Sequence, residues 1–229
     1  MNGPDWQWDE MQQVGTDYTD TAEVAAYDKR MGTFRNLNAE NRRILKALDL
    51  KPRSSVLELG CGTGRFACAA AAEGHSVCAA DVSLTMLSYV REKAAAKGLF
   101  ISELQHAGFL TLKSAAERFD AVVSNAALHH LPDAWKLTAL ENIARVLKPG
   151  GRLLLGDVVF SASSGVLSTD CMEHFVESFP QMHAEVARHT AREFSTYDWI
   201  MEGLIARAGL EILSVDPAPN SFIAYLCRK

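Results

Sequence analysis

The stretch "LELGCGTG" (residues 57–64) decides the fold, because it ends an apolar run with glycines at three alternate positions, Gly60, Gly62 and Gly64. Glycine is favoured where the backbone turns through positive φ or where a ligand must come close to the main chain. A loop of this kind, between a strand and a helix, directs backbone N–H groups and the helix N-terminus toward a ligand. The stretch predicts a ligand-binding turn, with a tight turn that binds nothing as the alternative.

Strands and helices alternate along the chain after this loop. Buried apolar runs bounded by turn residues predict strands at 54–60, 76–81, 99–105, 120–126 and 151–160. One helical stretch between them begins at the N-cap Ser83 and stops at Gly98, and a later one has Asp133 as its cap and ends at 149–151. Such alternation is typical of βαβ units, so we predict an α/β fold with a mostly parallel, doubly wound sheet and helices on both faces.

The C-terminal third has a different texture. Residues 161–195 are polar and have no clean period, so we expect an insertion over the carboxyl edge of the sheet. A helix follows, with Ser195 as its cap, Trp199 packed into the core and Gly209 at its end. The chain closes with two apolar runs, 210–216 and 221–229. The short connection "PAPN" permits an antiparallel pair but no crossover.

Composition narrows the class of protein. A chain of 229 residues with 48% hydrophobic and 22% charged residues has room for one α/β domain with a full core. The five scattered cysteines form no CxxC motif and predict reduced thiols in a cytoplasm. A net charge of −5 without a basic cluster predicts no nucleic-acid partner, and the absence of a long apolar run predicts no membrane segment. The oligomeric state is left open.

Two residues near the loop indicate the class of ligand. Asp81 ends the second strand about 20 residues after the loop, where an acidic side chain binds ribose hydroxyls. A dinucleotide fingerprint, GxGxxG, needs its third glycine at position 65, which is Arg65. This departure disfavours a nicotinamide-dependent reductase.

The segment "ELGCGTG" (58–64) resembles motif I of the class I S-adenosylmethionine-dependent methyltransferases. Four further stretches resemble later motifs of that family in the expected order: "AADVS" (79–83), "HAGFL" (106–110), "FDAVVSNAALHHLPD" (119–133) and "RVLKPGGRLLL" (145–155). The resemblance covers about 40–160 well and 196–229 in outline. It implies S-adenosyl-L-methionine as the cofactor, S-adenosyl-L-homocysteine as its product, and a seven-stranded sheet of order 3-2-1-4-5-7-6 whose last strand is antiparallel.

The same resemblance implies where the cofactor binds. Asp81 would hold the ribose, with Val82, Gly108 and Phe109 beside the adenine. The full set that it implies is Glu58, Gly60, Cys61, Gly62, Gly64, Asp81, Val82, Gly108, Phe109, Asn125 and Tyr27. Residues 1–40 would form a helical lid that touches the cofactor, and 41–229 the methyltransferase domain.

The acceptor side carries weaker signals. His129 and His130 follow the fourth strand at the carboxyl edge of the sheet, where such folds bind ligands. We take His129 as the candidate catalytic residue, which contacts substrate or acts as a base; the alternative is that both histidines only shape the turn. Three further candidates for contact with substrate are Asp157, Glu173 and His174.

The histidines of the insertion do not predict a metal site. His174, His183 and His189 are nine and six residues apart, so they do not stack on one helix face as residues four apart would. We therefore expect no metal.

The function that the sequence favours is methyl transfer to an unidentified small molecule, whose identity no motif reveals. Methylation of RNA or protein remains an alternative, as does a catalytically silent protein that binds the cofactor and serves as a partner. The closing run "FSTYDWIMEGLIARAGLEIL" (194–213) resembles one bacterial subgroup to which no activity can be attached.

Overall fold

The computed structural model describes residues 4–12, 14–33, 35–161, 167–218 and 220–229. Within these residues one sheet is formed by β1 (Ser55–Leu59), β2 (Ser76–Asp81), β3 (Glu103–His106), β4 (Phe119–Asn125), β5 (Leu147–Phe160), β6 (Thr196–Tyr197), β7 (Glu211–Pro217) and β8 (Phe222–Arg228). The strand order is β3-β2-β1-β4-β5-β8-β7, with the two-residue β6 paired to β5. Without β6 this is the predicted order, and β8 runs antiparallel to both of its neighbours as predicted.

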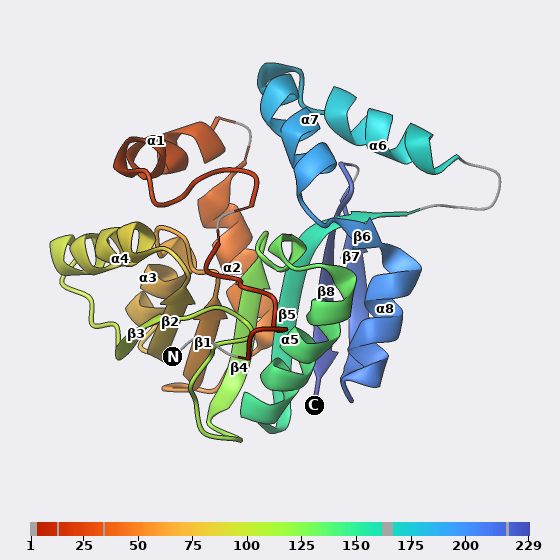
Figure 1. Ribbon diagram of the computed structural model, residues 1–229. Helices are drawn as coiled ribbons and strands as arrows, with labels where there is room; N and C mark the ends of the chain where they lie inside the picture. Colours follow the sequence, from red (N-terminus) through yellow and green to blue (C-terminus); the bar gives the residue numbers. More distant parts are fainter. Residues whose placement is uncertain (1–3, 13, 34, 162–166, 219) are drawn as a thin grey trace.

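Helices cover both faces of the sheet (Figure 1). They are α1 (Thr21–Met31), α2 (Leu37–Leu48), α3 (Arg65–Ala72), α4 (Leu84–Ala96), α5 (Asp133–Val146), α6 (Ser168–Glu177), α7 (His183–Arg192) and α8 (Asp198–Arg207), with 3-10 turns at Leu128–His130 and Pro180–Met182. Residues of α2, α3 and α4 share one buried cluster with the sheet, and residues of α5 and α8 share the other. The predicted α/β fold class is confirmed. No described helix is both long and apolar enough to cross a membrane.

The remaining helices gather at one edge of the sheet. Figure 1 shows α1 on one side and the pair α6–α7 on the other, both beyond the carboxyl ends of the parallel strands. These ends are where doubly wound sheets bind ligands. The predicted lid boundary at residues 40 and 41 falls within α2, which packs on the sheet with α3.

Several local predictions hold. The Ser83 hydroxyl caps α4 by accepting a hydrogen bond from the Met86 N–H (3.1 Å). Gly98 and Gly209 follow the C-caps of their helices with φ of +62° and +78°, a conformation that glycine adopts without strain.

Two predicted caps are wrong. Helix α5 has Pro132 at its N-cap, and Asp133 is its first residue. The Asp133 side chain instead pairs with Lys136 and accepts a hydrogen bond from the Thr196 hydroxyl. Helix α8 begins after Tyr197, and the Ser195 hydroxyl pairs with His189. In both places a tertiary partner takes the side chain that the local pattern assigns to a helix end.

The insertion is more regular than its sequence suggests. Helices α6 and α7 occupy most of 168–192, and their apolar residues Phe175 and Val186 form a small cluster with Phe160 of β5. The positions 162–166 of the predicted insertion lie outside the described residues. Trp199 is 66% exposed and stacks on Tyr197, so its predicted burial in the core is wrong.

Candidate active site

The three glycines of the loop have different tasks, although all have positive φ. A Cβ at Gly60 would lie 2.3 Å from the Cβ of Ala127, and one at Gly64 would lie 2.7 Å from the methyl groups of Val90. A Cβ at Gly62 would meet no described atom within 4 Å. Gly60 and Gly64 therefore allow close packing of protein on protein, and Gly62 alone keeps space open for a ligand.

Asp81 is fixed beside that open space. Its Oδ2 accepts a hydrogen bond from the Gly62 N–H (2.8 Å), and its Oδ1 accepts one from the Ser83 N–H (2.8 Å). Burial raises the pKa of this carboxyl above its usual value. Each carboxylate oxygen has a second lone pair, so Asp81 can still accept hydrogen bonds from a pair of ribose hydroxyls.

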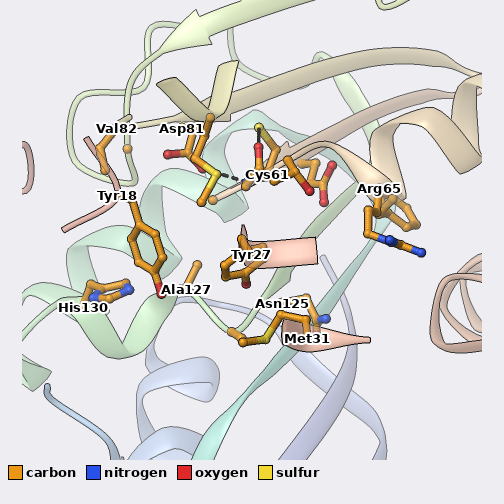
Figure 2. A pocket seen from close by; sticks show the side chains of 18 of the residues that line it. Tyr18, Tyr27, Met31, Cys61, Arg65, Asp81, Val82, Asn125, Ala127 and His130 are labelled. Carbon is orange, nitrogen blue, oxygen red and sulfur yellow. Dashed lines mark hydrogen bonds between the residues drawn. The ribbon is translucent and has the colours of Figure 1, made fainter. Parts of the chain in front are cut away.

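A cavity extends from the loop across the carboxyl ends of the strands. It is lined by ten of the eleven predicted cofactor residues, namely Glu58, Gly60, Cys61, Gly62, Asp81, Val82, Gly108, Phe109, Asn125 and Tyr27. Figure 2 shows Asp81 and Val82 on one side, Asn125 and Met31 on the other, and Tyr27 between them. The eleventh, Gly64, starts α3 and packs against Val90.

Polar contacts hold α1 over this cavity. The Thr63 hydroxyl donates to Asp28 Oδ1 (2.6 Å), and Lys93 Nζ donates to Asp28 Oδ2 (2.7 Å). These contacts hold the pKa of Asp28 below its usual value against the opposing effect of burial. The Ser83 hydroxyl donates to the Tyr18 carbonyl (2.5 Å). The lid that the sequence predicts is thus attached to the glycine loop itself.

Two polar groups of the cavity wall are kept uncharged by burial. Burial raises the pKa of Glu58 to about 8, and Glu58 Oε2 accepts a hydrogen bond from the Ala67 N–H (2.9 Å) in α3. Burial also raises the pKa of the Cys61 thiol, so this residue is a packing group and a poor nucleophile.

A second cavity of about 530 Å³ adjoins the first. Both are lined by Tyr18, Tyr27, Met31, Arg35, Glu40, Ile44, Asn125 and Ala126. The insertion lines the far side of the second cavity with the apolar residues Phe175, Phe179 and Val186 and with polar ones such as Glu185 and Arg188. A ligand in each cavity would therefore meet the other near the end of β4.

His129 lines this second cavity and lies between two carboxylates. Its Nδ1 lies 2.5 Å from Asp157 Oδ1, its backbone N–H donates to Asp157 Oδ2 (2.9 Å), and its Nε2 lies 3.2 Å from Glu193 Oε2. Burial acts to lower the pKa of His129, but Asp157 and then Glu193 outweigh it and raise the pKa to about 9. His129 is therefore a charged group whose orientation is fixed by two carboxylates.

His130 has the opposite character. It lines the cofactor cavity beside Tyr18 (Figure 2), and burial together with the neighbouring His129 lowers its pKa to about 4. The two adjacent histidines thus differ in charge at neutral pH and face different cavities.

Sequence reasoning missed Glu193 and its partner His189. His189 Nδ1 lies 2.6 Å from Glu193 Oε2, and the segment is tied to the site because the Phe194 N–H donates to the His129 carbonyl (2.7 Å). The buried Lys136 donates to the Phe194 carbonyl from α5. The spacing of four residues between His189 and Glu193 was the available signal, since it puts both on one helix face.

The other residues expected to contact the substrate lie in different environments. Asp157 contacts His129 directly, whereas Glu173 and His174 are exposed on α6. Trp8 packs edge-on against Phe194, and Trp6 is exposed and stacks on Trp135.

Comparison with known proteins agrees with this geometry. Residues 56–151 match a family model described as a methyltransferase domain. A demethylmenaquinone methyltransferase of Bacillus cytotoxicus is 26% identical over 185 residues, which cover 80% of this chain and 75% of the relative. A Bacillus cereus protein of the same name is 26% identical over 200 residues, or 81% of each chain.

Solved structures show the same fold. A SAM-dependent methyltransferase from Aquifex aeolicus has a TM-score of 0.65 at 20% identity, covering 91% of this chain and 98% of its own. The Burkholderia thailandensis 1,6-didemethyltoxoflavin-N1-methyltransferase was solved with bound 1,6-didemethyltoxoflavin and S-adenosylhomocysteine. It has a TM-score of 0.63 at 21% identity, and the match covers 91% of this chain and 86% of that one.

The chain belongs to the class I S-adenosylmethionine-dependent methyltransferase superfamily. S-adenosylmethionine is its cofactor, and the site fits this molecule: Gly62 leaves the space that a ligand needs, and Asp81 offers carboxylate oxygens for a ribose.

Proposed function

We propose that this enzyme methylates a small organic molecule held in the cavity between α1, β5 and the α6–α7 pair, with His129 and its carboxylate partners orienting the reacting group of the acceptor. The observation that carries the proposal is the second cavity itself, which adjoins the cofactor cavity and ends at the His129 cluster. The bacterial relatives named demethylmenaquinone methyltransferase support a small-molecule acceptor. Five free cysteines support a location in the cytoplasm.

The cofactor supplies an activated methyl group on a sulfonium, and the protein supplies position and a dry site. Gly62 N–H is oriented by Asp81, and Tyr27 closes the cavity from the lid. Holding two reactants in line at contact distance accounts for a large part of such an acceleration. Asn125 lines both cavities, so it stands where the methyl group would pass.

The charge of the acceptor wall favours a particular kind of reacting group. Asp157 and Glu193 bring two negative charges against one positive charge on His129, and all three side chains are at least nine-tenths buried. Glu193 lines the cavity beside His129, and its carboxylate favours an acceptor that donates a hydrogen bond. Other parts of the same cavity are lined by arginines, namely Arg30, Arg35, Arg43 and Arg188. We infer that the methylated atom carries a proton as O–H, S–H or N–H, and that the Glu193 carboxylate beside the charged His129 accepts a hydrogen bond from it.

A transfer assay tests the proposal. Methyl-labelled S-adenosylmethionine is incubated with the enzyme and with panels of phenols, thiols and amines, and in parallel with total RNA and total protein. Label is expected in a small molecule, with much slower transfer by His129→Gln at unchanged affinity for S-adenosylhomocysteine. Label that enters only RNA or protein would overturn the proposal in favour of the alternative acceptors, and full activity of His129→Gln would remove the proposed role of this residue.

A further inference from the structure

His129, His189 and Glu193 direct their free ligand atoms at one point. Nδ1 of His129 pairs with Asp157, so the other ring nitrogen, Nε2, faces Glu193. Nε2 of His189 pairs with the Ser195 hydroxyl (2.9 Å), so its Nδ1 faces the same Glu193 carboxylate. The three ligand atoms lie within 4.8 Å of one another. Two ring nitrogens that face one carboxylate need positive charge among them, which is supplied either by ring protons, as in the charged form of His129, or by a metal ion that replaces these protons.

We propose that this point is a transition-metal site of the zinc type, with His129 Nε2, His189 Nδ1 and a Glu193 carboxylate oxygen as the three protein ligands. Two imidazoles and one carboxylate form a donor set that zinc uses in catalytic sites, where a fourth position stays open. The open position would face the acceptor cavity, which all three residues line. The ligand for it would be a small molecule with an oxygen, nitrogen or sulfur donor.

The geometry needs only a small adjustment to accept an ion. Ligand atoms that bind one tetrahedral zinc at about 2.0–2.2 Å lie roughly 3.3 Å apart. Glu193 Oε2 lies 3.2 Å from His129 Nε2 and 2.6 Å from His189 Nδ1. All three ligand atoms lie within 4.8 Å of one another, so binding of an ion requires the two imidazole rings, as well as the Glu193 carboxylate, to shift by on the order of an ångström.

The outer contacts support the same assignment. Metal-binding histidines usually donate their second ring N–H to a carboxylate or another acceptor, which fixes the ring. His129 has Asp157 in this position, and Asp157 is itself held by the N–H groups of His129 and Val158. His189 has the Ser195 hydroxyl. The predicted absence of a metal considered only the spacing of the insertion histidines, and the fold supplies His129 from another segment.

Calorimetric titration of the chelator-treated, full-length enzyme with ZnCl₂ and with CoCl₂ tests the site without any acceptor, so its failure leaves the proposed transfer reaction standing. One equivalent should bind, and cobalt should give visible absorption bands of a four- or five-coordinate ion. His189→Ala and Glu193→Gln should each weaken binding at least tenfold. His183→Ala, at an exposed position of the same helix, should bind like the wild type.

No binding by the wild-type enzyme would overturn the metal site, as would equal binding by His189→Ala and Glu193→Gln. A folded-state check by circular dichroism accompanies each variant. If His189→Ala does not fold, Ser195→Ala replaces it, since loss of the outer contact should still weaken binding several-fold.

A second, independent observation concerns Glu10 in the cofactor cavity. Its Oε1 accepts hydrogen bonds from the Leu110 N–H (2.9 Å), the Thr111 N–H (2.7 Å) and the Thr111 hydroxyl (2.7 Å). Its Oε2 is fully buried and has no hydrogen-bond partner among the described residues. A carboxyl oxygen buried without a hydrogen-bond partner is costly, so it indicates a missing donor.

The surroundings of this oxygen identify the donor. Glu10 Oε2 would lie 2.3 Å from a Cβ at Gly108, so the glycine makes room for the carboxylate. Gly108 and Phe109 line the cavity at the positions expected beside the adenine ring. We propose, on the basis of the cofactor assignment, that Glu10 Oε2 accepts a hydrogen bond from the exocyclic amino group of the adenine.

The test compares S-adenosylhomocysteine with S-inosylhomocysteine, in which oxygen replaces that amino group. The wild type should bind the adenine form at least tenfold more tightly. In Glu10→Gln the amide oxygen can keep the bonds to Leu110 and Thr111, and the amide NH₂ then faces the purine, so the preference should fall at least tenfold or reverse. Glu92→Gln, exposed on α4, is the matched control. Equal binding of both ligands by the wild type, or an unchanged ratio in Glu10→Gln, would overturn the proposal.

Discussion

The cofactor half and the acceptor half of the cleft are built in different ways. The cofactor wall is built around the glycine loop at the end of β1, where Gly62 leaves open space and its N–H is held by Asp81 from the neighbouring strand β2. The acceptor wall consists of side chains from segments far apart in the sequence, such as His129, Asp157 and Glu193. The glycine loop tolerates few substitutions because a side chain at Gly62 would fill the ligand space. The side chains of the acceptor wall can be exchanged to suit a different acceptor.

The largest effect is expected from Gly62→Val. The substitution forces a β-branched residue into positive φ (+51°) and fills the only open space at the loop. Calorimetry with S-adenosylhomocysteine should show at least a hundredfold loss of affinity.

The matched control for this variant is Gly74→Val. Gly74 also has positive φ (+84°) and open space around its Cβ, but it lies in the turn before β2 and away from the cavity. It should lose stability to a similar extent and keep its affinity. Equal loss of affinity in both variants would show that backbone strain, and not the ligand space at Gly62, governs binding.

Removal of the Asp81 carboxylate should have the next largest effect. Asp81→Ala is expected to weaken binding of the cofactor by roughly 1–3 kcal/mol, the scale of lost hydrogen bonds to a charged group. Part of the loss arises because the Gly62 N–H also loses its acceptor. Affinity equal to that of the wild type in the same titration would remove Asp81 from the ribose.

Buried Glu58 makes the stability of the cofactor half depend on pH. Its pKa of about 8 in the folded protein lies above the value of about 4.3 in an unfolded chain. The folded state therefore binds the extra proton between these values, and the free energy of unfolding should fall as pH rises from about 4.3 to 8, by on the order of 2–4 kcal/mol.

Urea unfolding of the wild type and Glu58→Gln at several pH values measures this contribution. The glutamine can still accept the hydrogen bond from the Ala67 N–H, so only the titration is lost. The free energies of unfolding of the two proteins should be most alike at low pH, and Glu58→Gln should become increasingly more stable than the wild type as pH rises toward 8. If the free energy of unfolding depends on pH in the same way for both proteins across this range, Glu58 does not titrate as described.

The smallest effect is expected at the lid. Asp28→Ala removes the contacts from α1 to Thr63 and Lys93, and partly exposed contacts of this kind contribute about 1 kcal/mol or less each. Affinity for S-adenosylhomocysteine should fall roughly 3- to 10-fold, mainly through faster dissociation. Glu23→Ala, which breaks an ion pair within the same helix, should leave dissociation unchanged in stopped-flow measurements.

The sequence predicts the two halves of the molecule unequally, and the reason is physical. Parallel strands are buried on both faces, so the apolar runs predict the strands, while the order of the sheet and ten of the cavity residues follow from the resemblance of five motifs to the methyltransferase family. Ser195 and Asp133 look like helix caps locally, but their side chains pair with residues outside those helices, His189 and Thr196.

Residues whose partners lie far away in the sequence cannot be predicted from local sequence patterns. Glu10 reaches Thr111 across about a hundred positions, and Glu193 reaches His129 only because α7 returns to the end of β4. No local pattern encodes such a contact. The i,i+4 pair His189–Glu193 is the one part of the acceptor wall that the spacing alone could have indicated.

Calorimetric titration of the wild-type enzyme with S-adenosylmethionine and S-adenosylhomocysteine tests the central claim most directly. The account predicts that both bind with one site per chain and micromolar affinity, and that Gly62→Val abolishes both. Folded protein that binds neither would contradict the assignment of the glycine-loop cavity as the cofactor site.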